Sequence, residues 1–424
     1  MKVAVVGLGH IGLPLAVQYA GRGHQVIGSD INRRIVDTIN AGRSPHLDEE
    51  ALVERVPGLV ASGALRATVD NAEAVRSAEV VVVIVPVVVD AERQIDFGPI
   101  DAATADIGRG LRPGTLVVYE TTLPVGTTRD RFGPMLGAGS GLDLDRDFFL
   151  AFSPERVLVG RVFLDLGRYP KIVGGTSAES TARAVAFYTA ALDPGTEVRA
   201  VANAETAEMT KLAETTYRDV NIALANEYAR YAAGRGIDVL EVISAANSQP
   251  YSHIHMPGVG VGGHCIPVYP HFLFNGDPDL RLPPLARQVN EGMADFTVDL
   301  LRARLGDLRG VDVLVLGVAY RADVREDAFS SAFRLRDALR AAGARVHAHD
   351  PHFTDEHLRG LGFEPYDLAA PDPVRAAVLQ AGHAGYTELD PAAIPGLELF
   401  VDGRNALDRA RFDAAGVAYV GIGR

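Results

Sequence analysis

The chain has 424 residues, of which 47% are apolar and 22% charged, and its formal net charge is −13 at pH 7. This length predicts two or three domains with sizeable cores. The acidic charge argues against nucleic acid or an anionic membrane as a partner. The single cysteine excludes an intramolecular disulfide bond. The longest apolar run, residues 80–89, is too short to cross a membrane and contains Pro86, so we expect a cytoplasmic protein.

The first part of the chain, up to about residue 200, alternates short apolar runs with helical patterns. Strands are expected at residues 2–7, 25–30, 80–85, 115–120 and 148–153, and helices at residues 12–22 and 99–110. Alternation of this kind predicts βαβ units and a parallel sheet.

The stretch 202–234 has a different pattern, without proline and rich in alanine and glutamate. Its apolar residues recur at helical spacing, at positions 213, 217, 220, 224, 228 and 231. The pattern predicts one long helix that connects two lobes or forms the seam of a dimer. Helical segments continue to about residue 247 and occur again from about residue 283 to 305.

Strand and helix patterns return from about residue 310. A strand is expected at residues 311–320, a helix at 330–343 and another strand at 345–351. The similar starts VAVVGLG and VLVLGVA indicate two Rossmann-like lobes. We expect an α/β protein with two Rossmann-like, doubly wound domains joined by a long central helix. The expected domain boundaries are 1–200, 201–305 and 306–424.

A glycine fingerprint, Gly7-x-Gly9-x-x-Gly12, directly follows the first expected strand and opens a helix. Such glycines allow a tight turn, close approach of a pyrophosphate and close packing of helix on strand. Asp30 ends the next strand, where a carboxylate accepts from a ribose 2′-hydroxyl and repels a 2′-phosphate. NAD is therefore favoured over NADP, although the nearby cations Arg33 and Arg34 weaken that preference. The expected cofactor-binding residues are Gly7, Gly9, Ile11, Gly12, Asp30, Arg34, Pro86 and Thr121.

The second lobe has a single glycine after its first strand, so we expect it to bind a different ligand.

Cys265 lies before this lobe in the run GVGVGGHCIPVYP, residues 258–270, between four glycines and two prolines. A lone intracellular cysteine is commonly an inert buried residue. Glycines that bring the backbone close to a neighbour, and prolines that stiffen the exit, favour a presented thiol instead. The adjacent His264 is a weak candidate for lowering its pKa, and His264, Cys265 and His271 lack the spacing of a metal site, so no metal is expected.

Six motifs occur in order along the whole chain: GLGHIGLPLA (7–16), ETTLPVGTT (120–128), SPERVLVG (153–160), AEMTKLAETTYRDVNIALANE (207–227), GVGGHCIPVYP (260–270) and DGRN (402–405). Together they resemble the nucleotide-sugar 6-dehydrogenases of the UDP-glucose/GDP-mannose dehydrogenase family, most of all those acting on UDP-N-acetylmannosamine and UDP-N-acetylglucosamine. The resemblance implies a homodimer that forms through the central helix. It also implies NAD-dependent oxidation of a nucleotide-activated hexose, with a UDP-sugar favoured.

The implied reaction oxidises the C6 alcohol to an aldehyde, forms a thiohemiacetal on a cysteine, oxidises it to a thioester and releases a carboxylate with water. Matched position by position, Cys265 is the nucleophile and Lys211 the cation that stabilises the oxyanion. Glu155 is the acid/base for hydrolysis, and Thr122 supplies the hydroxyl that orders a water. The implied substrate-binding residues are Arg156, Tyr251, His253, Gly262, Tyr320, Arg321 and Arg404.

Several of these positions depart from the family's pattern. Tyr269 stands where the family has aspartate, and Thr215 stands where it has asparagine, one helical turn after Lys211. The substituted substrate positions are Tyr251, His253, Arg321 and Ala328. We therefore expect an NAD enzyme whose catalytic site includes Thr215 and Tyr269, with a changed substrate or a changed extent of oxidation. A two-electron dehydrogenase that stops at an aldehyde or ketone, and a non-catalytic NAD-binding homologue, are the alternatives.

Overall fold

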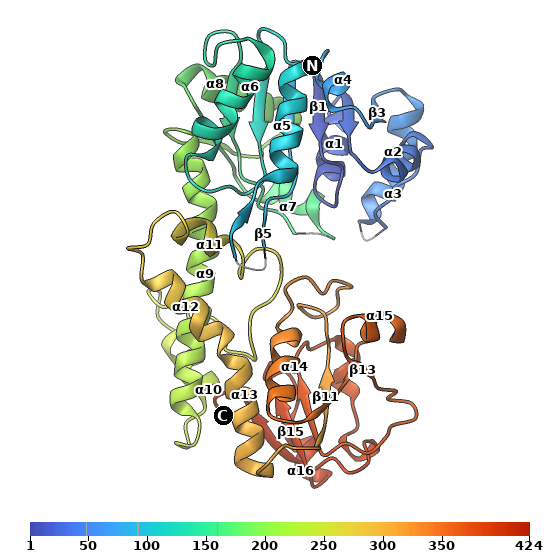
Figure 1. Ribbon diagram of the computed structural model, residues 1–424, viewed down its shortest axis with the longest axis vertical. Coiled ribbons are helices and arrows are strands. Elements are labelled where there is room, and N and C mark those ends of the chain that lie inside the picture. Colours follow the sequence, from blue (N-terminus) through green and yellow to red (C-terminus); the bar gives the residue numbers. More distant parts are fainter. Residues whose placement is uncertain (48, 91–92, 159) are drawn as a thin grey trace. The chain divides into compact units, whose positions relative to one another are not determined.

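The computed structural model describes residues 1–47, 49–90, 93–158 and 160–424 (Figure 1). The chain divides into two compact units. The first consists of Met1–Glu214 and His271–Gly276, and the second of Thr215–Pro270 and Asp277–Arg424. In the described part of the chain, no helix is long and apolar enough to cross a membrane.

The first unit is built on an eight-stranded sheet with the order β10-β9-β8-β7-β4-β1-β2-β3. Its strands are β1 (Lys2–Val6), β2 (Gln25–Ser29), β3 (Leu65–Thr68), β4 (Val80–Val83), β7 (Leu116–Tyr119), β8 (Phe149–Phe152), β9 (Lys171–Gly175) and β10 (Val198–Ala200). The strands from β3 to β8 are parallel, whereas β9 pairs antiparallel with β8. A separate two-stranded ladder joins β5 (Val88–Val89) to β6 (Ile95–Asp96).

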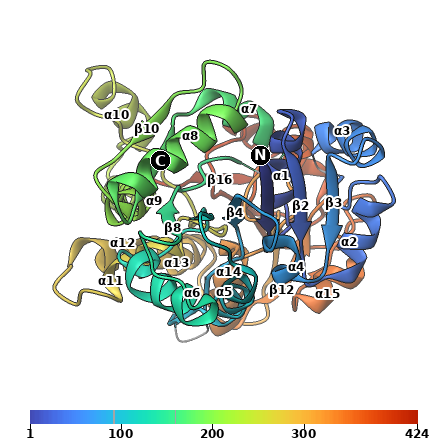
Figure 2. The ribbon, with the colours of Figure 1, turned by 90° about the horizontal axis from the view of Figure 1, so that it is seen from above.

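Helices cover both faces of this sheet (Figure 2). They are α1 (Gly12–Gly21), α2 (Arg33–Asn40), α3 (Glu50–Ala61), α4 (Asn71–Val75), α5 (Gly98–Gly110), the π-helical η1 (Thr127–Phe132), α6 (Gly133–Ser140), α7 (Val162–Arg168) and α8 (Ala178–Ala191). Buried side chains of α1, α3, α7 and α8 share one hydrophobic cluster with the sheet, while α4, α5 and α6 cover the other face. Side chains point alternately to the two faces of β1, so its apolar residues Val3–Val6 contribute to both layers.

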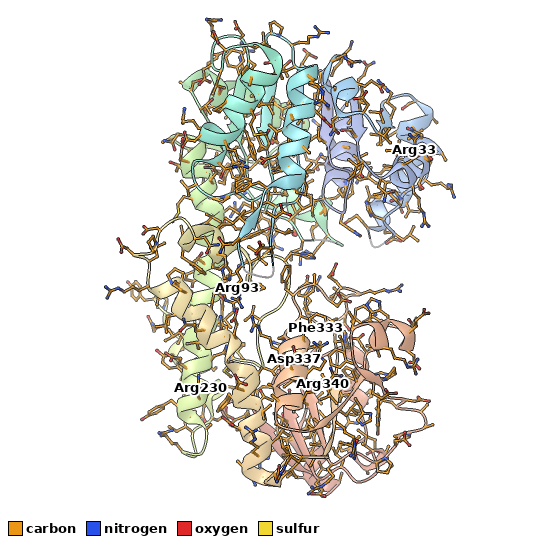
Figure 3. All side chains as sticks on the ribbon, viewed as in Figure 1. Arg33, Arg93, Arg230, Phe333, Asp337 and Arg340 are labelled. Atoms are coloured by element: carbon orange, nitrogen blue, oxygen red, sulfur yellow. The ribbon has the colours of Figure 1, made fainter. Side chains whose placement is uncertain are left out.

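The second unit contains a six-stranded, all-parallel sheet with the order β13-β12-β11-β14-β15-β16. Its strands are β11 (Asp312–Leu316), β12 (Arg345–His349), β13 (Glu364–Pro365), β14 (Ala376–Leu379), β15 (Leu399–Asp402) and β16 (Ala418–Gly421). Its helices are α10 (Val239–Ala246), α12 (Leu282–Glu291), α13 (Met293–Leu305), α14 (Ser331–Ala341), α15 (Asp355–Gly360), η2 (Ala384–Glu388), η3 (Pro391–Ala393) and α16 (Arg409–Ala414). On α14, Leu335 and Leu339 are buried, whereas Asp337 and Arg340 are exposed to solvent (Figure 3).

The long helix predicted from the sequence is α9 (Ala204–Ala232), which begins in the first unit and ends in the second. Its run of residues free of proline and glycine explains its length. Gly234 and Gly236, with φ of +73° and +69°, follow its end and separate it from α10. A short helix, α11 (Tyr269–Phe274), follows the cysteine loop.

The predicted fold class is confirmed: the protein is α/β, with two Rossmann-like sheets and a long helix between them in the sequence. All the strands that were expected are present. The strand expected at 311–320 is shorter, since β11 ends at Leu316. Gly317 follows with φ of +84°, a conformation that turns the chain out of the sheet and favours glycine.

Candidate active site

The glycine fingerprint forms the turn between β1 and α1. Gly7 has φ of +96°, in the left-handed region that favours glycine. A Cβ atom placed on Gly12 would lie 1.9 Å from the backbone oxygen of Gly7, so the helix and the turn pack too closely for any other residue. A Cβ atom on Gly9 would meet nothing within 4 Å. Gly12 therefore serves packing, and Gly9 leaves open space beside the amino end of α1, where a pyrophosphate fits.

Asp30 lies directly after β2, half-buried at the edge of this space. Its carboxylate accepts hydrogen bonds from the backbone N–H of Leu8 (2.9 Å) and of Asn32 (2.8 Å). These bonds hold it beside the glycine turn, which fits a carboxylate that accepts from an adenosine ribose.

Other expected cofactor residues of the first unit lie at the ends of its strands. The Thr121 hydroxyl donates to the Val85 carbonyl (2.7 Å) and so links the ends of β7 and β4, next to the exposed Pro86. Ile11 is the residue before α1, and Arg34 is exposed on α2. The residues present therefore fit a bound dinucleotide.

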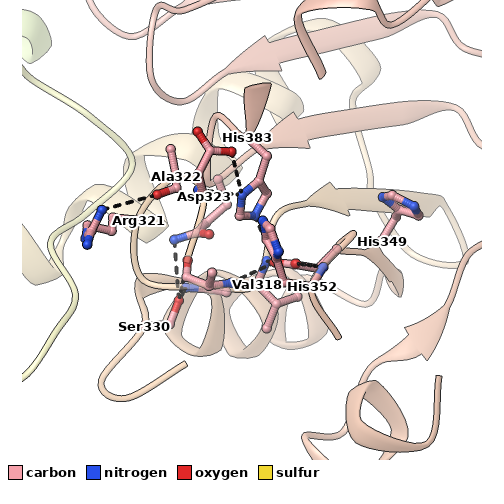
Figure 4. A network of polar contacts seen from close by, with 12 residues as sticks. Val318, Arg321, Ala322, Asp323, Ser330, His349, His352 and His383 are labelled. Carbon is pink, nitrogen blue, oxygen red and sulfur yellow. Dashed lines mark hydrogen bonds and ion pairs between the residues drawn. The ribbon is translucent and has the colours of Figure 1, made fainter. Parts of the chain in front are cut away.

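The second unit repeats this turn with a different chemistry (Figure 4). Asp350 follows β12 as Asp30 follows β2, but it is only 3% exposed. Its carboxylate accepts from the backbone N–H groups of Val318 (2.7 Å) and Ala319 (2.9 Å) and from Nε2 of His383 (3.0 Å). A carboxylate enclosed in this way cannot reach a ribose, which agrees with the prediction of a different ligand for the second lobe.

Three potential metal ligands lie beside Asp350. The ligand atoms of Asp323, His352 and His383 are within 4.8 Å of one another. However, Nε2 of His383 donates to Asp350, and Nδ1 of His383 accepts from the backbone N–H of Asp323 (2.9 Å). Only Asp323 and His352 remain, fewer than the three protein ligands of an open zinc site. We therefore assign no metal to this cluster.

Two of the predicted catalytic residues meet in the first unit. Lys211, on α9 and 9% exposed, donates from Nζ to the backbone oxygen of Glu155 (2.5 Å). The neighbouring Arg156 pairs with Glu214 of α9 (2.5 Å) and donates to the carbonyl of Pro170 (3.1 Å). Both contacts fasten the loop after β8 in place, so that α9 presents an ammonium group beside the predicted acid/base.

The Glu155 carboxyl itself contacts two residues that the sequence analysis missed. It accepts from Nζ of Lys171 (2.8 Å), which also bonds the buried carboxyl of Glu120 (2.6 Å). Burial raises the pKa of Glu120 to about 7, because it outweighs the attraction of Lys171. Burial also opposes ionisation of Glu155, but Lys171 and hydrogen bonds outweigh it and lower the pKa of Glu155. The sequence held a signal for both residues, a charge next to an apolar strand. Glu120 follows the run VVY, and Lys171 begins the run KIVGG.

A small cavity lies beside this group. It has a volume of about 10 Å³ and is lined by Glu155, Arg156, Asp165 and Lys171 among others. That volume is close to the minimum that holds one water molecule. Thr122, the predicted water-ordering residue, is 5% exposed in the loop after β7.

The predicted nucleophile belongs to the second unit. Cys265 is half-buried, and its carbonyl accepts from the backbone N–H of Tyr269 (2.9 Å), which forms the turn into α11. The glycines before it are needed for contact with the Tyr320 ring. A Cβ on Gly263, whose φ is +95°, would lie 2.8 Å from that ring, and a Cβ on Gly262 would lie 3.0 Å from Cβ of Tyr320.

Arg404 closes the other side of the glycine loop. It donates to the carbonyls of Gln380 (2.5 Å) and Gly260 (3.0 Å), and a Cβ on Gly258 would lie 2.9 Å from its Nη1 atom. Burial lowers the pKa of Arg404 to about 10, against the attraction of Asp402. A cation held mainly by neutral acceptors suits an anionic ligand.

The remaining predicted residues have varied surroundings. Arg321 is exposed, with its guanidinium 5.7 Å from the centre of the Tyr320 ring. Tyr251 is 93% exposed, and His253 is exposed, so neither lines an enclosed pocket of its own unit. Thr215 is fully buried on α9, whereas Tyr269 is half-buried.

Comparison with known proteins agrees with this arrangement. Three family models match: the NAD-binding domain (residues 1–192), the central domain (205–291) and the UDP-binding domain (314–409) of the UDP-glucose/GDP-mannose dehydrogenase family. The chain is 35% identical to a UDP-N-acetyl-D-mannosamine dehydrogenase of Pyrococcus horikoshii over 84% of this chain and 85% of that protein. It is 37% identical to the Salmonella typhi protein of the same name, over 85% and 86%.

Solved structures are similar over the whole chain. A UDP-D-ManNAc dehydrogenase from Pyrococcus horikoshii matches with a TM-score of 0.89 and 31% identity, covering 100% of this chain and 99% of that one. An NDP-N-acetyl-D-galactosaminuronic acid dehydrogenase from Methanosarcina mazei Go1 matches with a TM-score of 0.87 and 31% identity, covering 100% and 95%. The chain therefore belongs to the UDP-glucose/GDP-mannose dehydrogenase family and is an NAD-dependent nucleotide-sugar dehydrogenase.

Proposed function

We propose that the enzyme oxidises the C6 alcohol of a UDP-N-acetylhexosamine to the carboxylate, with UDP-N-acetylmannosamine as the first candidate. The observation that carries this proposal is the contact between Lys211 and Glu155, which joins two of the expected catalytic groups. The names of the similar proteins support the choice of sugar. The Arg404 cation, with the exposed Arg321 as a second cation, supports binding of the pyrophosphate in the second unit.

In this proposal each chain residue has a distinct task. The glycine turn would hold NAD, which would supply the hydride acceptor for each of the two oxidations. Cys265 adds to the aldehyde and later carries the thioester, because a thiolate is both a good nucleophile and a good leaving group. Lys211 stabilises the negative oxygen that develops in these steps. Glu155 removes a proton from the water that attacks the thioester, and Thr122 orients that water.

The substituted residues belong to the same proposal. Tyr269 cannot be the anionic group that an aspartate provides near neutral pH, since a tyrosine ionises near pH ~10. Thr215 offers a shorter donor than an asparagine. Together with Tyr251, His253 and Arg321, they adapt the site to a particular sugar or to a different balance between its two oxidations.

The stoichiometry of NADH formation tests this function. We expect two NADH per sugar with UDP-N-acetylmannosamine, compared across a panel of UDP- and GDP-hexoses. Cys265→Ser should stop the second oxidation while leaving the first hydride transfer largely intact. One NADH per sugar in the unaltered enzyme would instead indicate a two-electron dehydrogenase. Absence of NADH with the whole panel would indicate a non-catalytic homologue.

A cytoplasmic homodimer through α9 is also part of the proposal, with residues 1–200, 201–305 and 306–424 as cofactor, dimerisation and nucleotide-sugar domains. Its support is a row of exposed apolar side chains on one face of α9: Tyr217, Leu224, Tyr228 and Tyr231. Sedimentation should show a dimer that Leu224→Glu and Tyr228→Glu convert to monomers. The control is Leu164→Glu, a more exposed apolar site on α7, and a monomeric unaltered protein would contradict the proposal.

A further inference from the structure

Three charged side chains meet at one edge of the first sheet because of its topology. Glu120 and Glu155 lie just beyond the carboxyl ends of the parallel strands β7 and β8. The next strand, β9, runs antiparallel, with Phe152 opposite Gly174, so its first residue lies at the same edge. Continuing that register places Lys171 opposite Glu155. The reversed direction of β9 relative to β8 therefore brings a lysine between two glutamates.

The contacts of this cluster leave little freedom to its members. Nζ of Lys171 donates to Glu120 (2.6 Å) and to Glu155 (2.8 Å). The other oxygen of Glu120 accepts from the hydroxyls of Tyr188 on α8 (2.6 Å) and Tyr19 on α1 (3.1 Å). The exposed fraction of the side chains is 0% for Glu120, 5% for Lys171 and 11% for Glu155. Glu155 is therefore the most exposed of the three.

The charges of Glu120, Glu155 and Lys171 favour one proton bound to the two carboxyl groups. Two carboxyl groups share the ammonium group of Lys171, so these three buried side chains would together carry a net negative charge if all were ionised, which is costly. The two carboxyl groups interact by charge and by a hydrogen bond between them. Burial raises the pKa of Glu120 to about 7, whereas the pKa of Glu155 is lowered despite its burial. Near neutral pH the pair can therefore take up or release one proton, with Glu155 as the ionised partner.

Other charged groups face the cluster from the elements packed around it. Lys211 of α9 bonds the backbone oxygen of Glu155, and Arg156 donates its own backbone N–H to the Glu155 carboxylate (2.6 Å). Asp165 of α7 lines the same small cavity but is paired with Arg161 (2.9 Å). These groups fix the loop, while Lys171 and Glu120 are the charged side chains that hydrogen-bond to the Glu155 carboxyl.

We propose that Lys171 and Glu120 are positioning residues that act through Glu155 during hydrolysis of the thioester. Lys171 fixes the carboxylate of Glu155 in its ionised form. As the C–O bond forms and the C–S bond breaks, a proton leaves the attacking water for Glu155. The Glu155–Glu120 pair holds this proton until it is released to solvent with the product. This inference rests on the proposed function, in which Glu155 is the base.

Two variants separate positioning from a structural role. In Glu120→Gln the base Glu155 loses the carboxyl partner with which it shares the proton, so hydrolysis slows while both oxidations continue. We expect a burst of two NADH per active site followed by a kcat lowered about tenfold or more, with KM for the sugar within about twofold. In Lys171→Met two buried carboxyls face each other without a cation, so the acid limb of the kcat profile moves to higher pH. Lys171→Arg should restore the limb in part.

A matched control is Glu208→Gln. Glu208 is also a buried carboxyl whose pKa burial raises to about 7, but it accepts from Gly126 and Thr128 rather than contacting Glu155. It should leave both the NADH burst and the acid limb as in the unaltered enzyme. The inference is overturned if Glu120→Gln shows no burst, if Lys171→Met keeps the unaltered pH profile, or if Glu208→Gln gives the same changes.

A measurement without substrate keeps this test separate from that of the proposed function. A carboxyl whose folded pKa is raised contributes stability that is full below its unfolded pKa of ~4.3 and is lost as pH rises towards 7. Glu120→Gln should therefore flatten the fall in unfolding free energy over this range. An unaltered enzyme that forms no NADH would overturn the proposed function, and in that case an unchanged stability slope in Glu120→Gln would overturn the coupling as well.

Discussion

Nζ of Lys211 lies 2.5 Å from the backbone oxygen of Glu155, which holds a buried ammonium group of α9 against the loop after β8. A backbone carbonyl is a neutral acceptor, so this bond holds the ammonium group without neutralising its charge. Such a preorganised cation is suited to an oxygen that becomes negative during the reaction.

Lys211→Met should therefore lower kcat by about 100-fold or more, with a smaller effect on KM, because the lost interaction is stronger in the transition state. Steady-state kinetics with the sugar that gives the highest turnover would measure this. Arg230→Met, which removes an exposed cation from the same helix, is the control and should leave kcat within about twofold. Equal losses in the two variants would contradict the role of Lys211.

Gly9 and Gly12 should respond differently to the same substitution. Gly12→Ala places a Cβ 1.9 Å from the backbone oxygen of Gly7, so we expect a loss of about 3 kcal/mol or more of unfolding free energy. Gly9→Ala meets nothing within 4 Å, so the protein should fold with nearly unchanged stability. Its affinity for NAD should fall about tenfold or more, because the methyl group occupies space for the pyrophosphate. Thermal unfolding and NAD titration would separate the two, and a stable Gly12→Ala protein would refute the packing argument.

The close packing of the cysteine loop on Tyr320 can be tested at Gly263. Gly263→Ala combines φ of +95° with a Cβ 2.8 Å from the Tyr320 ring, so it should displace the loop and lower kcat. Gly236→Ala is the matched control, since Gly236 also has a positive φ of +69° but open space around it. The control should lose only about 1–2 kcal/mol of stability and keep its activity. Similar activities of the two variants would show that contact with Tyr320 is unimportant.

Asp30 and Asp350 occupy equivalent turns, but substituting them should have different effects: loss of NAD affinity for Asp30 and loss of stability for Asp350. Burial alone would raise the pKa of Asp350, but the hydrogen bond from His383 and three backbone N–H groups outweigh it and lower the pKa to about 2. Asp350→Ala should therefore cost about 3 kcal/mol or more of unfolding free energy. That contribution is fully present above the unfolded pKa of ~3.9 and is lost as pH falls towards 2.

Asp30→Ala serves as the comparison, since its side chain is half-buried and accepts from the backbone N–H groups of Leu8 and Asn32. We expect a stability loss within about 1 kcal/mol and an NAD affinity lowered about tenfold or more. Unfolding at several pH values and NAD titration would check both variants. If Asp350→Ala weakened NAD binding as much as Asp30→Ala, the two turns would not have the different functions assigned here.

Much of the fold followed from local patterns. The buried strand at Val80–Val83 and the long helix α9 could be predicted because apolar runs and helical spacing are properties of neighbouring residues. The end of β11 was placed too late because the apolar run continues beyond Gly317, and only the positive φ of that glycine ends the strand.

The sequence allowed a candidate site to be proposed at the positions marked by glycine spacing or by a motif. Gly7, Gly9 and Gly12 could be assigned separate tasks before the contacts of their backbone were known. The roles of Cys265 and Lys211 came from resemblance to the family rather than from their surroundings. Tyr251 was assigned in the same way, and its 93% exposure shows that a matched position does not describe an environment.

The sequence by itself determined the order of the elements, the glycine turn for NAD and the family, because each of these depends on residues close together in the chain. The tertiary structure alone decided which charges are buried together. Lys171 is 51 residues from Glu120, and the two meet only because β9 reverses direction next to β8. The electrostatic energy of such a pair depends on distance and burial, and no local pattern in the sequence records either.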